Sequence, residues 1–116
     1  MKIISKRGAF QGDLLLRPVG ALPANAVMRP RDGRLIVGHS ETGHHHAIDE
    51  MKVAHFEVPG DPLVCYLQLD DASCDVVHHR SWDTHETARL TRRVSRVWEV
   101  RRQRERAPEG WRRVAD

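Results

Sequence analysis

Short runs of mainly apolar and β-branched residues, separated by turn residues, fill about the first ninety positions of the chain, and the side chains of residues 53–58 fall alternately on two faces. Alternation with a period of two is typical of β-strands that bury one face. Runs such as Pro59-Gly60-Asp61-Pro62 are turn signals that end these segments. The pattern predicts strands over residues 2–10, 13–18, 26–29, 34–38, 44–49, 53–58, 63–69 and 74–79.

Strands this short and this closely spaced indicate a mainly β fold, arranged as a small β-barrel or a sandwich. The 116 residues fit one domain, so we expect a single β domain over residues 1–116. Its last segment, 106–116, contains a proline and a glycine, and we expect it to be a short irregular tail. The segment 26–29 is short enough to be an edge strand, and Asp32-Gly33 after it is a signal for a hairpin turn into 34–38.

The segment after Trp82 fits two structures. Residues 83–86 match a helical capping box, and the apolar residues between positions 90 and 98 fall near one helical face. Residues 94–100 also alternate, and their β-branched and aromatic side chains favour a strand. The pattern alone leaves helix and strand open.

Histidines are concentrated in the middle of the chain, where seven of the eight lie between positions 39 and 79. His44 and His46 are two residues apart, so in an extended segment they lie on one face and His45 lies on the other. Two imidazoles on one face form half of a site for a divalent metal ion. We therefore predict His44 and His46 as metal ligands, and expect His45 to face solvent or a different layer.

Completing this site requires ligands from elsewhere, because zinc, iron(II) or manganese takes three or four nitrogen and oxygen ligands at about 2.0–2.2 Å. We expect His85 to supply the third ligand, with His79 as the alternative and Glu50 as the carboxylate. His39 could join if its loop folds back. Asp83 fits better as an acceptor that fixes the tautomer of a ligating imidazole. An open position on the metal would permit metal-activated water or dioxygen chemistry, but no feature identifies a substrate or decides whether the protein is an enzyme.

The spacing of Gly38, His44, His46 and Glu50 resembles the first sequence motif of the cupin β-barrels. This resemblance implies a barrel in which the two histidines and the glutamate bind one metal ion together with a histidine from later in the chain. It covers residues 38–50.

A second resemblance covers more of the chain. Gln11-Gly12-Asp13, the segment Thr42-Gly43-His44-x-His46, a later histidine-rich stretch, and an ending that runs from Glu99-Val100-Arg101-Arg102-Gln103-Arg104-Glu105 to Val114-Ala115-Asp116 are similar to a family of small uncharacterised bacterial and phage proteins. The resemblance implies a compact, mainly β fold with residues 98–104 forming a strand packed on the sheet. It implies no established activity.

The net charge of +3 conceals an uneven distribution. Residues 1–88 carry nine Lys and Arg against twelve Asp and Glu, whereas residues 89–116 carry ten Arg against four Asp and Glu. A basic end of this kind can contact phosphate groups or an acidic partner, and it can equally be a solvated surface. Arg101, Arg102 and Arg104 are the candidate contacts to an anion or a nucleic acid. Binding of nucleic acid by this basic segment is one functional hypothesis.

Composition narrows the remaining hypotheses. Apolar runs fall well short of the about 20 residues that span a bilayer, and the N-terminal apolar stretch is too short for a signal peptide. We therefore expect no membrane association and a cytoplasmic location, or a virion location for a phage-encoded chain. Cys65 and Cys74 are too few for a disulfide scaffold and indicate two reduced, half-buried thiols. The main alternative to a metal-binding protein is a non-enzymatic assembly component, a homo-oligomer or virion part that acts through protein contacts.

Overall fold

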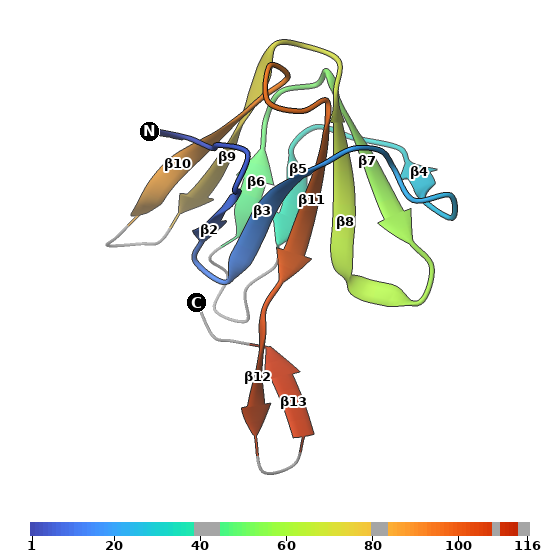
Figure 1. Ribbon diagram of the computed structural model, residues 1–116, viewed down its shortest axis with the longest axis vertical. Helices are drawn as coiled ribbons and strands as arrows, with labels where there is room; N and C mark the ends of the chain where they lie inside the picture. Colours follow the sequence, from blue (N-terminus) through green and yellow to red (C-terminus); the bar gives the residue numbers. More distant parts are fainter. Residues whose placement is uncertain (39–44, 80–83, 108–109, 114–116) are drawn as a thin grey trace.

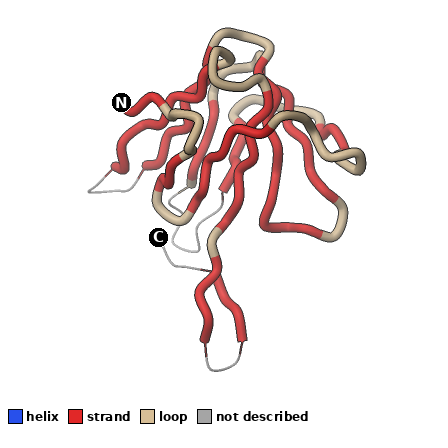
Figure 2. Tube along the Cα trace, viewed as in Figure 1, coloured by secondary structure: helices blue, strands red, loops and turns tan. Residues whose placement is uncertain are grey.

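The structure is a computed structural model that describes residues 1–38, 45–79, 84–107 and 110–113. Within these ranges, only the backbone is described for residues 79, 84–85, 104–107 and 110–113. Two β-sheets face each other, and a two-stranded hairpin extends from them (Figure 1). Every regular element in these ranges is a strand (Figure 2). Of the two expected arrangements, the sandwich is therefore the one observed.

The first sheet, called sheet A, contains five strands. Its strand order is β1 (Lys2–Ile3), β10 (Thr84–Thr91), β9 (Ser73–His79), β6 (His46–Ile48) and β5 (Leu35–Gly38). The pairing of β1 with β10 is parallel, and the other pairings are antiparallel. Sheet A therefore ends in two edges, at β1 and at β5.

The second sheet, called sheet B, contains six strands. Its strand order is β2 (Ala9–Gln11), β3 (Leu14–Val19), β11 (Val97–Arg102), β8 (Asp61–Leu69), β7 (Val53–Val58) and β4 (Val27–Arg29). All of its pairings are antiparallel. Beyond β11, β12 (Arg104–Ala107) and β13 (Gly110–Arg113) pair with each other as the separate hairpin.

The main hydrophobic core lies between the two sheets, because alternate residues of each strand point inward. Trp98 on β11 is fully buried, and its indole Nε1 donates a hydrogen bond to the carbonyl of Ser95 at 2.8 Å. A smaller cluster centred on Phe56, Tyr66 and Val97 covers the outer face of sheet B. The main core contains Ile4, Leu14, Leu16, Leu35, Val37, Ile48, Val53, Cys65, Leu67, Leu69, Cys74, Val76, Ala88, Leu90, Trp98 and Val100.

The segment after Trp82 is extended rather than helical. Residues 84–91 form β10 and residues 97–102 form β11, which lies between β3 and β8. The helical alternative is therefore wrong, since alternation brings Trp98 and Val100 into the core together. The strand implied by the family resemblance is confirmed over its first part, because β11 ends at Arg102.

Two turn predictions also differ from the structure. Asp32-Gly33 does not form a hairpin, because β4 and β5 belong to different sheets and this turn carries the chain from sheet B to sheet A. Gly33 adopts a φ of 75°, a conformation that favours glycine. The tail expected to be irregular instead forms the hairpin of β12 and β13, with Gly110 at the start of the second strand.

The edge position expected for 26–29 is confirmed, since β4 is the last strand of sheet B. Cys65 and Cys74 are both free thiols, and both are buried rather than half buried. Within the described ranges, no helix is long and apolar enough to cross a membrane.

Candidate functional site

His46 lies at the centre of a buried polar cluster between the two sheets. It begins β6, where it is the register partner of Gly38 on β5 and of His78 on β9. Its side chain is 1% exposed. The last residue of β2 and the turn that follows it supply two polar partners from the opposite sheet: Nδ1 lies 2.9 Å from Gln11 Oε1, and Nε2 lies 3.3 Å from Asp13 Oδ1.

The amide of Gln11 determines which nitrogen of His46 carries a proton. Its Nε2 donates hydrogen bonds to the carbonyls of Val76 at 2.7 Å and Glu86 at 3.0 Å. These two acceptors fix the orientation of the amide, so Oε1 faces His46 as an acceptor. The Nδ1 of His46 therefore donates the hydrogen bond, and its Nε2 is the nitrogen that faces Asp13.

The contact between His46 Nε2 and Asp13 Oδ1 is one that a bound cation would stabilise. A neutral imidazole protonated at Nδ1 has a lone pair at Nε2, and an ionised carboxylate has only acceptors. Two acceptors in contact repel each other, whereas a proton or a metal ion held between them makes the contact favourable. Asp13 is 9% exposed, so its carboxylate lies largely away from solvent.

Three histidines occupy neighbouring register positions across sheet A. His46 on β6 is the partner of His78 on β9, and His78 is in turn the partner of His85 on β10. The rings of His46 and His78 stack, with centroids 3.8 Å apart and planes inclined by 16°. His79 is the partner of Thr84 and so lies outside this row. The backbone thus aligns His46, His78 and His85.

Gly38 lets β5 approach the imidazole of His46 closely. A Cβ at position 38 would lie 3.1 Å from His46 Cδ2 and 3.0 Å from Leu14 Cδ1. Contacts this short are tighter than most Cβ contacts in proteins, so a methyl group at position 38 would push Leu14 or His46 aside by a few tenths of an ångström. The same glycine begins the cupin-like spacing found in the sequence.

The remaining sequence-predicted ligands are placed as follows. His44, His39 and Asp83 lie outside the described residues. For His79 and His85, the structure describes the backbone positions given above. His45, immediately before β6, is half buried.

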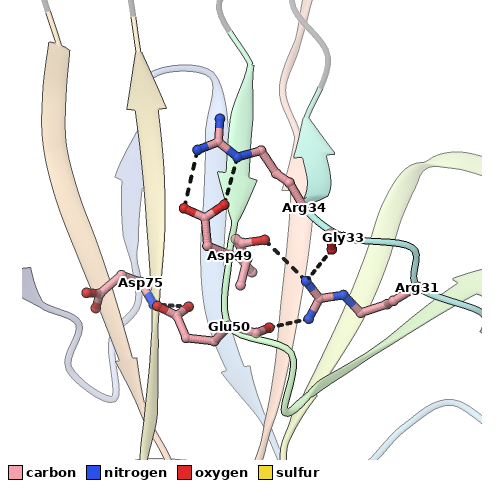
Figure 3. A network of polar contacts seen from close by, with 7 residues as sticks. Arg31, Gly33, Arg34, Asp49, Glu50 and Asp75 are labelled. Atoms are coloured by element: carbon pink, nitrogen blue, oxygen red, sulfur yellow. Dashed lines mark hydrogen bonds and ion pairs between the residues drawn. The ribbon is translucent and has the colours of Figure 1, made fainter.

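Glu50 lies beyond the far end of β6 from His46, where its Oε2 accepts a hydrogen bond from the backbone N–H of Asp75 at 3.1 Å (Figure 3). Figure 3 also shows Arg31 donating to the backbone carbonyl of Glu50 and to that of Gly33. Arg34 forms an ion pair with Asp49 at 2.7 Å in the same network. The structure therefore places Glu50 in a network that links strand ends, and does not bring it to His46.

Gln11, Asp13 and His78 belong to the cluster, and sequence reasoning did not select them. Gln11-Gly12-Asp13 was noted only as part of a family resemblance. A detectable signal was the presence of two polar residues that flank a turn glycine next to the apolar run 14–16. For His78 the signal was strand parity, which places His78 with the buried Val76 and Cys74 and places His79 on the other face.

The candidate anion contacts are divided between different parts of the molecule. Arg101 lies on the outer face of sheet B, where its Nε is 3.2 Å from Glu99 Oε1. Arg102 lines a cavity of about 550 Å³ between β5 and the β7–β8 hairpin, together with His55, Val37 and other residues. Burial lowers the pKa of His55 in this cavity. Arg104 is the first residue of β12.

A family model described as "Domain of unknown function (DUF8820)" matches residues 10–103 of the chain. The match begins within β2 and ends just after β11, so it includes both sheets except β1 and the first residue of β2, and excludes the C-terminal hairpin. Comparisons with curated proteins and with solved structures gave no match.

Proposed function

We propose that this chain, which belongs to the domain family of unknown function DUF8820, binds a divalent metal ion where His46 of sheet A meets Asp13 of sheet B. The contact between His46 Nε2 and Asp13 Oδ1, at 3.3 Å, carries the proposal. Two ligands that each lie about 2.0–2.2 Å from one metal ion are roughly 3.0–3.5 Å from each other in octahedral or tetrahedral geometry. The observed separation supports a shared ion.

The surroundings of His46 also support a metal ligand. Metal-binding histidines commonly donate their second ring N–H to a carbonyl or carboxylate, which fixes the tautomer and the ring orientation. Gln11 Oε1 accepts such a bond from Nδ1, and the stack on His78 holds the plane of the ring. His46 thus enters the site with its orientation already determined.

The remaining ligands are expected from parts of the chain whose side chains are not described. Within the described residues, no group of three or more His, Cys, Asp and Glu side chains could hold a metal ion. Strand parity favours His44, which has the same parity as His46, and register favours His85, which lies in the same row. His79 is the alternative. A set of nitrogen and oxygen ligands suits zinc, iron(II) or manganese.

The metal content of untagged protein tests the proposal. We expect nearly one divalent ion per chain by inductively coupled plasma mass spectrometry. His44→Ala, His46→Ala and Asp13→Asn should each remove most of the metal, whereas His45→Ala and Glu50→Gln should retain it. Circular dichroism of each variant checks that the sheets still form.

Two outcomes would contradict the proposal. One is protein that carries no metal as purified and takes up none during titration with zinc, manganese or iron(II). The other is equal loss of metal from His45→Ala and His46→Ala, which would indicate nonspecific binding by the histidine run rather than a site selected by strand parity.

An assembly role is a second candidate, supported by apolar side chains on edge strands. Met28 on β4 is 62% exposed, and Ile3 on β1 and Phe10 on β2 are each 61% exposed. Exposed edges with apolar side chains are typical sites for pairing with another chain. Sedimentation velocity should then show an oligomer that Met28→Lys or Phe10→Lys dissociates, and a monomer at all concentrations would exclude homo-oligomerisation.

A further inference from the structure

The C-terminal hairpin extends away from the two sheets (Figure 1). Its strands β12 and β13 pair with each other in a sheet of their own. The connection from β11 is anchored where the backbone N–H of Gln103 donates to the carbonyl of Asp13 at 2.9 Å. The hairpin is therefore a short ribbon attached to a fixed point on the sandwich.

The register of the hairpin separates its residues into two faces. Arg104 is the partner of Arg113, and Arg106 is the partner of Trp111. Cross-strand partners share a face, and residues two apart on one strand also share a face. Arg104, Arg106, Trp111 and Arg113 consequently occupy one face of the ribbon, which we call the arginine face.

The opposite face has a different composition. It contains Glu105, whose partner is Arg112, and Ala107, whose partner is Gly110. Glu105, the acidic residue of the two strands, is thus the register partner of an arginine on this second face. Of the eight strand positions, the four on the arginine face are three arginines and one tryptophan, and none of the four is acidic.

Three arginines of the sandwich, in the sequence just before the hairpin, form ion pairs with carboxylates. Arg89 lies 2.8 Å from Asp75, Arg96 lies 3.1 Å from Asp70, and Arg101 lies 3.2 Å from Glu99. Each is an ion pair that offsets the positive charge locally.

We propose that the arginine face binds single-stranded nucleic acid, with Arg104, Arg106 and Arg113 contacting phosphates and Trp111 stacking on a base. Proteins that bind single strands combine basic residues, which follow the backbone, with aromatic side chains, on which bases stack. Trp111 favours a single strand over a duplex, because paired bases present their edges in the grooves and keep their faces stacked. This site uses no side chain of the proposed metal site.

Fluorescence anisotropy with the full-length chain and a fluorescein-labelled oligonucleotide of fifteen thymidines tests the proposal. We expect saturable binding with a slope of log K against log salt of about −2, since each phosphate neutralised on a single strand contributes roughly −0.7. The variant R104Q/R106Q/R113Q should weaken binding about a hundredfold in 50 mM salt and reduce the slope towards zero. Trp111→Leu should weaken it about tenfold, and Trp111→Phe should retain most of the affinity.

Matched controls distinguish the arginine face from net charge. Arg112→Gln removes an arginine from the opposite face of the hairpin, and R92Q/R93Q removes two exposed arginines from the turn after β10. Both should bind the oligonucleotide within about twofold of the unaltered chain. Equal losses from these controls and from the arginine-face variants would overturn the proposal.

Competition separates the possible anions. Tighter binding to a duplex of the same length would overturn the single-strand assignment. Competition by heparin or polyglutamate that is as effective as unlabelled oligonucleotide, together with no effect of Trp111→Leu, would assign the hairpin to acidic polymers in general. Absence of any binding at 50 mM salt would reject the site altogether.

Discussion

His46 and His78 stack face to face in the interior of the sandwich, with ring centroids 3.8 Å apart, because β6 and β9 hold them at partner positions. His46 is 1% exposed and His78 is fully buried. The two stacked rings belong to sheet A, and Gln11 and Asp13 of sheet B contact the His46 ring of this stack. The geometry of the cluster therefore depends on how the two sheets pack at this end.

The side-chain amide of Gln11 should contribute to both stability and metal affinity. Gln11→Leu keeps the approximate shape but leaves the carbonyls of Val76 and Glu86 and the Nδ1–H of His46 without this partner. Buried groups that lose a hydrogen bond cost about 1–3 kcal/mol each, and a carbonyl with a second partner costs less. We expect urea denaturation to show a loss of about 2–4 kcal/mol. Affinity for zinc, measured by competition with a chromophoric chelator, should fall about 10- to 100-fold.

Gln68→Leu is the control for this change, since Gln68 is a half-buried glutamine on β8 in the same core-lining sheet. It should cost less than about 1 kcal/mol and leave zinc affinity unchanged. If Gln11→Leu were no more destabilising than Gln68→Leu, the hydrogen bonds of Gln11 would not account for the position of His46.

Gly38→Ala should disturb the histidine cluster through packing alone. The new Cβ would lie 3.0 Å from Leu14 Cδ1 and 3.1 Å from His46 Cδ2, so one of these buried side chains must move. Overpacking of this kind costs about 1–3 kcal/mol. Thermal denaturation should show the loss, and zinc affinity should fall because the ring of His46 is displaced.

Gly20→Ala is the matched control, because a Cβ there would meet nothing within 4 Å and the residue lies in a loop. It should leave the stability unchanged or raise it slightly, since alanine restricts the unfolded chain. Equal stability of the two variants would show that β5 can move away from His46 without cost.

Much of the fold was predictable from alternation and turn residues. The segments 34–38, 53–58, 63–69 and 74–79 all correspond to strands, because each is a short run rich in β-branched and apolar residues between turn or loop residues. The partner of each strand was not predictable. Asp32-Gly33 shows why, since a local turn signal does not reveal whether the next strand joins the same sheet or the opposite one.

The candidate site was predictable only where its residues are close in sequence. Spacing identified His46, and strand parity could have identified His78. Gln11 and Asp13 reach His46 from 35 and 33 residues earlier in the chain, through the packing of sheet B on sheet A. No local sequence pattern predicts that contact. Glu50 was expected as a ligand because of the barrel-like spacing of the sequence, whereas in the structure its side chain accepts a hydrogen bond from Asp75.

The two cysteines should be unreactive while the protein is folded. Burial raises the pKa of the Cys65 thiol to about 12, and burial also raises that of Cys74 to about 12. At pH 8 only about one thiol in ten thousand would then be the reactive thiolate. Native protein should show almost no fast reaction with Ellman's reagent, whereas protein in guanidinium chloride should show two thiols per chain. A fast equivalent in the native protein would show that one thiol reaches solvent without unfolding.

Glu99 is a buried carboxylate held on the outer face of sheet B. Its Oε2 accepts hydrogen bonds from Tyr66 Oη at 3.0 Å and from Arg17 at 3.1 Å, and its Oε1 accepts one from Arg101 at 3.2 Å. Burial raises the pKa of Glu99, but the hydrogen bonds from Arg101, Tyr66 and Arg17 lower it more, so the pKa lies below the ordinary value of 4.5. Folding therefore favours the ionised form of this side chain.

Glu99→Gln should reduce stability at neutral pH and lose its effect in acid. A carboxyl group whose pKa is lower in the folded state stabilises the fold above its unfolded pKa, and this contribution disappears as the pH falls through the folded value. We expect urea denaturation to show a deficit of about 1–2 kcal/mol at pH 7 that shrinks below pH 4.5. Glu57→Gln is the control, because Glu57 is 49% exposed in its pair with Arg29 and exposed pairs contribute little. A deficit for Glu99→Gln that stays constant down to pH 3 would mean that its size reflects lost packing rather than the charge of Glu99.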